Sequence, residues 1–375
     1  MTEETVPAVA PGLRLWTASR TARRLLTAGR PFTLAERMTE LASSRYAVDE
    51  PTDVYGDGLI ETLESRVARL LGKPSALWFP TGTMAQQAIL RVWSARGGTN
   101  RIAVHPLQHT QQHEDHAFSI LSGLEPVFLT TEPRQPSAAD VKAATGPLGA
   151  VVIELPMQEL GYVLPAWSEY VDLSDAARDR GVPLHVDGAR IWESQHHFAR
   201  PLPEIAALAS SIYVSMYKGL GGLSGAVVAS DREAIEEARV WRTRYGGNLF
   251  RQFPTVIAAL DGLDSKLDRM ADLVHHAAVV AETLAQLPQL TVSPNPPHIN
   301  QFFIYAHLPA DALNQAVVEH LESTGDRWLH GWWTDSDGRT VGEANIQDAG
   351  LEWTAANVVD TGRAVLAAAS RIAGD

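Results

Sequence analysis

The sequence predicts an α/β fold built on a mostly parallel sheet, followed by a smaller α+β domain. Short apolar segments such as RIAVH (101–105) and GAVVIEL (149–155) alternate with longer segments of helical periodicity. Strands that are apolar on both faces are typical of parallel sheets covered by helices on both sides. After about residue 264 this alternation gives way to one long helical segment and a Trp-rich region, which indicates a second domain.

The elements follow one another with clear boundaries. The first helix of the alternation begins at Leu59, places Leu63 and Val67 on the same face, and ends on Gly72. A strand follows it, and the same order then recurs. We expect helices at 82–97, 167–181, 266–287, 311–323 and 354–373, and strands at 75–80, 101–105, 125–129, 149–155, 183–187, 210–216, 224–230, 300–308 and around 327–333.

The change of pattern suggests three segments. We expect residues 46–265 to form a large cofactor-binding domain and residues 266–375 a small C-terminal domain. The N-terminal segment, residues 1–45, should pack with the small domain, and its first twelve residues, which are acidic and contain proline, should be disordered.

Composition excludes several classes of function. The 375 residues carry a net charge of −13, which argues against nucleic acid and anionic membranes as partners. The absence of cysteine excludes disulfides, thiolate nucleophiles and Cys-ligated metals. No signal peptide and no apolar run of about 18 residues is present. We therefore expect a soluble cytoplasmic protein that acts on a small molecule.

Two charged residues follow neighbouring strands of the predicted sheet. Asp187 ends the strand PLHVD, and Lys218 follows the strand SSIYVSM. Ligands of doubly wound sheets lie at the carboxyl ends of the strands, so both side chains should face one crevice. A buried carboxylate needs a cationic partner, such as a protonated pyridine nitrogen, and a buried lysine can form a Schiff base with an aldehyde. This pair of requirements points to pyridoxal 5′-phosphate.

The phosphate of that cofactor needs a helix N-terminus. The segment FPTGTMAQQ offers one, because a strand ends and Thr81, Gly82 and Thr83 lead into a helix. No GxGxxG in a strand-to-helix context and no GxxxxGK[ST] is present, which argues against a nucleotide cofactor.

These motifs resemble the threonine aldolase and β-eliminating lyase family of fold-type I pyridoxal-phosphate enzymes. The resemblance runs from about residue 55 to 287 through YGDGLIETLESRVARLLGK, FPTGTMAQQ, LHVDGARIWES, SMYKGLGGLSGAVV and WRTRYGGNLFRQ. It implies an aspartate aminotransferase-like fold and a homodimer or homotetramer. DGAR and KGLG at this separation are more specific than either short motif alone.

The resemblance also implies roles for individual residues. Lys218 corresponds to the Schiff-base lysine, Asp187 to the partner of the pyridinium nitrogen, and His109 to the imidazole that stacks on the cofactor ring. Arg190 is expected to contact cofactor or substrate carboxylate. Gly82 and Thr83, helped by Arg251, are expected to hold the phosphate.

The expected activity is cleavage of a β-hydroxy-α-amino acid into glycine and an aldehyde, with His109 as the base for the β-hydroxyl proton. Two departures leave β-elimination, or another reaction through a Cα carbanion, as an alternative. The serine of the family's RSDT-like segment is missing from GRPFTLAERM, and Tyr217 precedes the lysine where the family often has serine. A non-catalytic pyridoxal-phosphate protein is a further alternative from a different class.

The histidines raise one more alternative. His105, His109, His113 and His116 are spaced four, four and three residues apart, which on a continuous helix would align four imidazoles for a metal. HEDH is not the HExxH motif, however, and the helix is expected to start after His105-Pro106. We expect no metal site.

Overall fold

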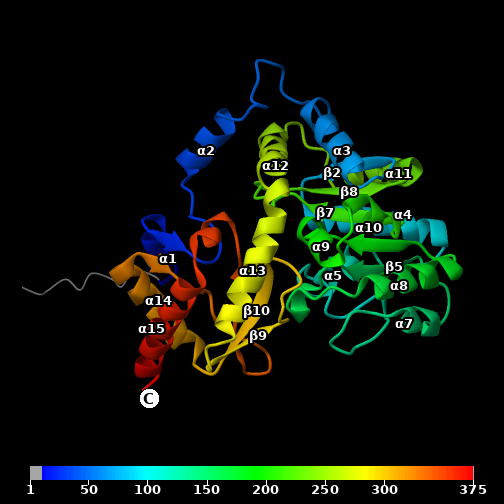
Figure 1. The fold of residues 1–375 in the computed structure, drawn as a ribbon. Helices are drawn as coiled ribbons and strands as arrows, with labels where there is room; N and C mark the ends of the chain where they lie inside the picture. The colour runs from blue at the N-terminus through cyan, green and yellow to red at the C-terminus, as the bar shows by residue number, and fades with distance from the viewer. Residues whose placement is uncertain (1–10, 375) are drawn as a thin grey trace, which may run out of the picture. The chain divides into compact units, whose positions relative to one another are not determined.

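The computed structural model describes residues 11–374. The chain divides into two compact units, a large unit of residues 38–271 and a small unit of residues 1–37 and 272–375. The expected disorder of the first twelve residues is wrong for Pro11 and Gly12, which begin helix α1 (Pro11–Arg20), and otherwise lies outside the described residues. Figure 1 shows the elements of both units in chain order.

The large unit contains a seven-stranded sheet in the order β2-β8-β7-β6-β5-β3-β4. Strand β8 is antiparallel to both of its neighbours, and the pairs β7-β6, β6-β5, β5-β3 and β3-β4 are parallel. The sheet is therefore mostly parallel, as the apolar strands predict. Its strands are β2 (Ser75–Phe79), β3 (Arg101–Val104), β4 (Glu125–Phe128), β5 (Ala150–Glu154), β6 (Leu184–Asp187), β7 (Ser211–Ser215) and β8 (Ala226–Ser230).

Helices cover this sheet because successive residues of its strands point to opposite faces and both sets are apolar. Leu77, Phe79 and Val152 share one buried cluster with α4 and α11, while Trp78 and Val186, on the alternate positions, are also fully buried. The helices of the unit are α3 (Leu59–Leu70), α4 (Gly82–Gly97), α5 (His109–Gln112), α6 (Ala117–Ile120), α7 (Ala138–Ala143), α8 (Trp167–Asp179), α9 (Ile191–Phe198), α10 (Leu202–Ala207), α11 (Arg232–Arg244) and α12 (Phe253–Ser265).

The small unit is built around the four-stranded sheet β12-β13-β10-β9 and a parallel pair of β1 with β11. Besides α1, its elements are β1 (Arg24–Leu25), β9 (Leu290–Ser293), β10 (Gln301–Ala306), α14 (Ala310–Thr324), β11 (Asp326–Arg327), β12 (Trp333–Thr334), β13 (Thr340–Asn345) and α15 (Ala355–Ala373). Helices α2 (Leu34–Ala42) and α13 (Met270–Leu284) run through the two points where the chain passes between units.

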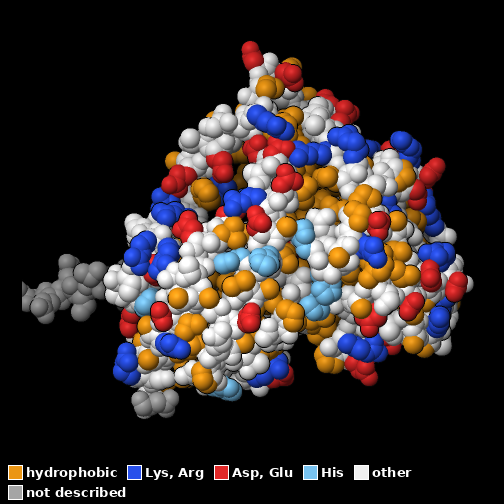
Figure 2. All heavy atoms as spheres, in the orientation of Figure 1, with side chains coloured by type: hydrophobic (Ala, Val, Ile, Leu, Met, Phe, Trp, Pro, Cys, Tyr) orange, Lys and Arg blue, Asp and Glu red, His pale blue; other side chains and the backbone are white. Residues whose placement is uncertain are grey.

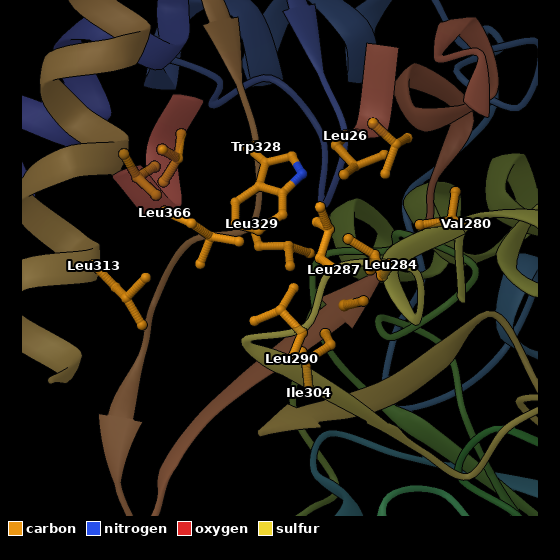
Figure 3. Close-up of a cluster of buried hydrophobic side chains, with 14 of the residues drawn as sticks. Leu26, Val280, Leu284, Leu287, Leu290, Ile304, Leu313, Trp328, Leu329 and Leu366 are labelled. Carbon is orange, nitrogen blue, oxygen red and sulfur yellow. The ribbon is translucent and has the colours of Figure 1, made fainter. Parts of the chain in front are cut away.

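The N-terminal segment contributes directly to the core of the small unit. Leu26 is fully buried in one apolar cluster with Leu284, Trp328 and Leu366, and Figure 3 shows these side chains meeting from different elements. Asp326 of β11 also accepts hydrogen bonds from Arg23, next to strand β1. Residues far apart in the sequence therefore complete one hydrophobic core.

The surface is mixed in charge. Figure 2 shows Asp and Glu side chains interspersed with Lys and Arg over the visible face. Within residues 11–374, no helix combines the length and the apolar character that crossing a membrane requires.

Candidate active site

A cavity of about 250 Å³ lies at the carboxyl ends of strands in the large unit. Strands β2, β3, β6 and β7 run in the same direction, so the residues that follow them meet at one edge of the sheet. The cavity is lined by Pro80, Thr81, Gly82, Thr83, Gln86, His109, Glu114, Asp187, Tyr213, Tyr217, Lys218, Ser224 and Gly225. The structure thus brings most of the site residues predicted from sequence into one place.

Asp187 and Lys218 both line this cavity, and their charges influence each other. Burial raises the pKa of Asp187, while the Lys218 charge and a hydrogen bond from the Ala189 backbone N–H to Oδ1 (3.1 Å) lower it. Burial also lowers the pKa of Lys218, an effect that Arg190 reinforces and Asp187 opposes. Each charge therefore stabilises the other, and the lysine is easier to deprotonate than one in water.

The N-terminus of α4 forms one wall of the cavity. Thr81 caps this helix, since its side chain accepts a hydrogen bond from the Met84 backbone N–H (3.3 Å). The first backbone N–H groups of a helix have no partner within it, and the helix dipole favours an anion there. Gly82 has to be glycine because a Cβ at this position would collide with the Tyr213 hydroxyl. The wall therefore presents the first backbone N–H groups of α4, with no side chain at Gly82.

The backbone of His109, at the start of α5, is hydrogen-bonded to the buried carboxyl group of Glu154. Its backbone N–H donates to Glu154 Oε2 (3.0 Å), and the Gln158 backbone N–H donates to Glu154 Oε1 (3.1 Å). Burial, together with the charge of Lys218, lowers the pKa of His109 to about 4. Its buried Nδ1 has no hydrogen-bond partner among the described residues. The ring is consequently a neutral imidazole with a nitrogen available to a ligand.

Glu114 lines the cavity although the sequence did not single it out. The Gln87 side-chain amide donates to Glu114 Oε2 (3.0 Å); the other carboxyl oxygen has no geometrically complete hydrogen bond within the described part of the chain, although the Thr83 side chain is one of the groups that lower the pKa of Glu114. Burial raises the pKa of Glu114 to about 7. This carboxyl is therefore partly protonated at neutral pH.

Two predicted site residues lie outside the cavity lining. The Arg190 guanidinium lies over the Tyr162 ring, 5.0 Å from its centroid, although its charge still contributes to the pKa values of Lys218 and His109. Arg251 is exposed, lies over the Phe250 ring at 4.0 Å and donates to the Phe250 carbonyl (3.2 Å). The large unit by itself does not bring Arg251 to Gly82 and Thr83.

The spaced histidines do not share one helix face. The chain leaves helical geometry after α5, with His113 at the end of that helix and His116 in a left-handed conformation before α6. His105 is buried and bonds through Nε2 to the Glu132 carbonyl (2.8 Å). Residues 11–374 contain no group of three or more His, Asp or Glu side chains placed to hold a metal ion.

Other buried polar residues at the site were also missed. Gln86 follows Thr83 by one helical turn, so its place on the cavity wall could have been found from helical spacing. Glu193 is fully buried, both of its carboxyl oxygens lack a partner among the described residues, and its carboxylate occupies the space where a Cβ of Gly219 would be. Only the tertiary structure places Glu193 next to the segment that carries Lys218.

The sequence profile of the beta-eliminating lyase family matches residues 33–308. The chain belongs to the beta-eliminating lyase family. This family assignment confirms the expectation of an enzyme related to threonine aldolases. The low specificity L-threonine aldolase of Escherichia coli strain K12 is 29% identical to this chain over 251 residues, which cover 62% of the chain and 72% of that enzyme.

Solved structures agree with the family and with the fold. A structure from Listeria monocytogenes, named as a candidate L-allo-threonine aldolase, superimposes with a TM-score of 0.88 at 32% identity, covering 96% of the present chain and 100% of that chain. A serine palmitoyltransferase from Sphingomonas wittichii shares the fold, with a TM-score of 0.65 at 14% identity. The expected α/β architecture of fold type I is thereby confirmed.

Proposed function

We propose that the protein is a pyridoxal 5′-phosphate-dependent aldehyde-lyase of the threonine aldolase type, which cleaves a β-hydroxy-α-amino acid into glycine and an aldehyde. The observation that carries the proposal is that the partly buried Lys218 and the buried Asp187 share one cavity with the N-terminus of α4. The E. coli relative, named as a low specificity L-threonine aldolase, supports the same class of substrate.

The residues of the cavity fit three of the polar groups of pyridoxal 5′-phosphate, namely its aldehyde, its ring nitrogen and its phosphate. Lys218 offers an amine of lowered pKa to the aldehyde, and Asp187 offers a carboxylate to the protonated ring nitrogen. The backbone N–H groups of Gly82 and Thr83, in the first turn of α4, suit the phosphate, and the wall has no Cβ at Gly82. When bound, the cofactor supplies an electron sink for the negative charge that bond cleavage leaves on Cα.

Glu114 is compatible with a phosphate on this wall because burial keeps it partly protonated at neutral pH. A fully ionised carboxylate in the same cavity would repel a dianion. The raised pKa of Glu114 thus removes an electrostatic conflict that the residue would otherwise create.

The reaction requires two proton movements. The β-hydroxyl of the substrate loses its proton, the electron pair of the Cα–Cβ bond stays with Cα, and Cα then gains a proton. No other reactant is consumed. We assign the first movement to His109, because it is unprotonated at neutral pH and its buried Nδ1 has no partner among the described residues. Lys218 lowers the pKa of His109 through its charge, so an uncharged Lys218 makes His109 a stronger base.

β-Elimination is the second candidate, because the family profile carries that activity in its name and the position before Lys218 is Tyr217, which lines the cavity. The same first contacts would serve both reactions. The products separate them: elimination releases ammonia and a keto acid, whereas aldol cleavage releases glycine and an aldehyde.

We also infer a homodimer or homotetramer in the cytoplasm. The large unit exposes the apolar side chains of Tyr55 and Phe250, each 54% exposed and in edge contact at 5.3 Å between ring centroids. Exposed apolar side chains that lie together, rather than singly, are typical of interaction surfaces. Sedimentation of the purified protein measures the state directly, and a monomer at micromolar concentration contradicts this inference.

Replacement of Lys218 tests the proposed function. Lys218→Ala should abolish the shift in absorption that pyridoxal 5′-phosphate undergoes when it forms a Schiff base with the protein, and the release of glycine from L-threonine and L-allo-threonine. Lys73→Met is the matched control, because burial lowers the pKa of Lys73 too, while its Nζ bonds to the Ala209 carbonyl and does not line the cavity. Retention of wild-type turnover in Lys218→Ala, or its loss only in the control, contradicts the proposal.

A further inference from the structure

We propose that Trp93, Ser211, His185 and Gln86 form a one-directional chain of buried hydrogen bonds that turns the Gln86 amide N–H toward Asp187. His185 and Gln86 would then be positioning residues for this carboxylate. The significance of the chain for catalysis rests on the proposed function, but the hydrogen-bond arrangement itself does not.

The four side chains contact one another in sequence inside the large unit. Trp93 Nε1 donates to Ser211 Oγ at 2.8 Å, and Ser211 Oγ lies 2.7 Å from His185 Nδ1. His185 Nε2 lies 2.6 Å from Gln86 Oε1. The Ser211 and His185 side chains are fully buried, and Gln86 is 1% exposed. Water therefore cannot replace any of these partners without opening the fold.

The backbone explains why these residues meet. His185 and Asp187 are two residues apart on β6 and so point to the same face of the sheet, and Ser211 of β7 is paired with His185 in register. Gln86 and Trp93 are seven residues apart on α4, which places them on one helix face. Asp187 therefore lies on the same face of the sheet as the hydrogen-bonded side chains of His185 and Ser211.

The chemistry of the end groups sets the direction of the chain. An indole N–H can only donate, and an amide oxygen can only accept. His185 Nε2 must therefore carry the proton that is donated to Gln86 Oε1. Because burial lowers the pKa of His185 to about 3, the ring is neutral, and its Nδ1 has to accept a hydrogen bond from the Ser211 hydroxyl.

The last link reaches the active site. Because Gln86 Oε1 accepts from His185, only the amide nitrogen of Gln86 remains to contact another group. Within residues 11–374 this buried nitrogen has no geometrically complete hydrogen bond. Gln86 and Asp187 both line the cavity, and the Gln86 amide is one of the groups that lower the pKa of Asp187. The reverse orientation would present an amide oxygen to a carboxylate, which is repulsive.

The consequence is a fixed donor for the charged form of Asp187. Burial favours the neutral form of this carboxyl, whereas a ring cation requires the charged form. A glutamine free to turn would supply a donor or an acceptor with similar ease. The series of hydrogen bonds removes that choice, because it fixes the His185 tautomer with its proton on Nε2, and this N–H in turn fixes Gln86 with its oxygen toward His185.

Imidazole ¹⁵N–¹H correlation spectra of the cofactor-free protein test the arrangement at about pH 6, just below the ordinary pKa of histidine. We expect His185, assigned by its absence in His185→Gln, to be neutral with its proton on Nε2. In Ser211→Ala the Nδ1 acceptor loses its donor, and we expect the ring signals to shift. Ser230→Ala is the control, because Ser230 is an equally buried serine that donates to the Ser210 carbonyl (2.8 Å). A proton on Nδ1, or a charged ring, overturns the proposal.

Cofactor affinity tests the last link. Gln86→Leu should weaken the binding of pyridoxal 5′-phosphate about tenfold or more, the usual effect of losing a hydrogen bond to a charged group. Gln252→Leu is the control, because Gln252 is also a buried glutamine whose side-chain oxygen accepts a ring N–H, that of Trp78 Nε1 at 2.8 Å, and it lies outside the cavity lining. Equal losses in both variants overturn the role of Gln86. Absence of binding by the wild type refutes the proposed function instead, and the ¹⁵N spectra then decide the arrangement alone.

Discussion

The cofactor-free protein should become less stable as pH rises through neutrality, and Glu114→Gln should remove part of that loss. Glu114 is 7% exposed, with one carboxyl oxygen held by Gln87 and the other without a geometrically complete hydrogen bond among the described residues. Glutamine keeps the size of the side chain and one acceptor oxygen for Gln87 but cannot ionise. The variant therefore isolates the cost of a buried negative charge.

The magnitude follows from the pKa of the carboxyl. Burial raises the pKa of Glu114 from 4.5 to about 7, so the folded protein binds this proton more tightly than the unfolded chain does. At about 1.4 kcal/mol for each tenfold change in proton affinity, the charge costs roughly 3 kcal/mol of unfolding free energy once it is fully formed. The stabilisation that the protonated Glu114 gives the folded protein is fully present below pH 4.5 and is lost as pH rises to about 7.

Urea unfolding of the cofactor-free wild type and of Glu114→Gln from about pH 5 to 8 measures the effect, with midpoints converted through a common slope. From pH 5 to 8, the unfolding free energy of Glu114→Gln should rise relative to that of the wild type by roughly 2–3 kcal/mol. Glu204→Gln, at an exposed position of α10, serves as the control and should show no such trend. A pH-independent difference between Glu114→Gln and the wild type refutes the reasoning.

Three further predictions concern the cavity and the small unit. Gly82→Ala should weaken binding of pyridoxal 5′-phosphate, because the added Cβ meets the Tyr213 hydroxyl, and Tyr213→Phe in the same chain should restore part of the affinity; equal affinities of single and double variants contradict this contact. Leu26→Ala should lower the unfolding free energy, measured in urea titrations, by about 2–5 kcal/mol. Leu13 is 55% exposed, so Leu13→Ala should change it by less than about 0.5 kcal/mol. Similar values for the two variants would mean that Leu26 is not a core residue. His109 should not titrate in NMR spectra of the cofactor-free protein between about pH 5.5 and 8, since its pKa is lowered to about 4; a midpoint near 6.5 would show that its burial is incomplete.

The fold could be predicted well from local pattern. Helix α4 occupies Gly82–Gly97, the same residues that the sequence predicts, because a threonine cap and a terminal glycine mark its two ends. The long helix expected at 266–287 is shorter in the structure, where a 3₁₀ turn at Leu267–Arg269 precedes α13. End effects of this kind depend on packing and leave little trace in the sequence.

The site could be predicted only where a residue type and a strand end coincide. Asp187 and Lys218 follow apolar strands, so their convergence could be foreseen. Glu114 and His185 carry no such signal, because their roles depend on partners distant in sequence, Gln87 and Gln86 respectively. Arg251 shows the opposite case: it matches a motif position of the family, yet its side chain does not line the cavity of the large unit.

The most direct test of the central claim is to locate the cofactor on the chain. The protein loaded with pyridoxal 5′-phosphate is reduced with borohydride, digested, and its peptides are analysed by mass spectrometry. The proposed function predicts the reduced pyridoxyl group on Lys218, within the segment SMYKGLGG, and not on Lys73. A label on another lysine, or no label on a protein that still releases glycine from threonine, would contradict it.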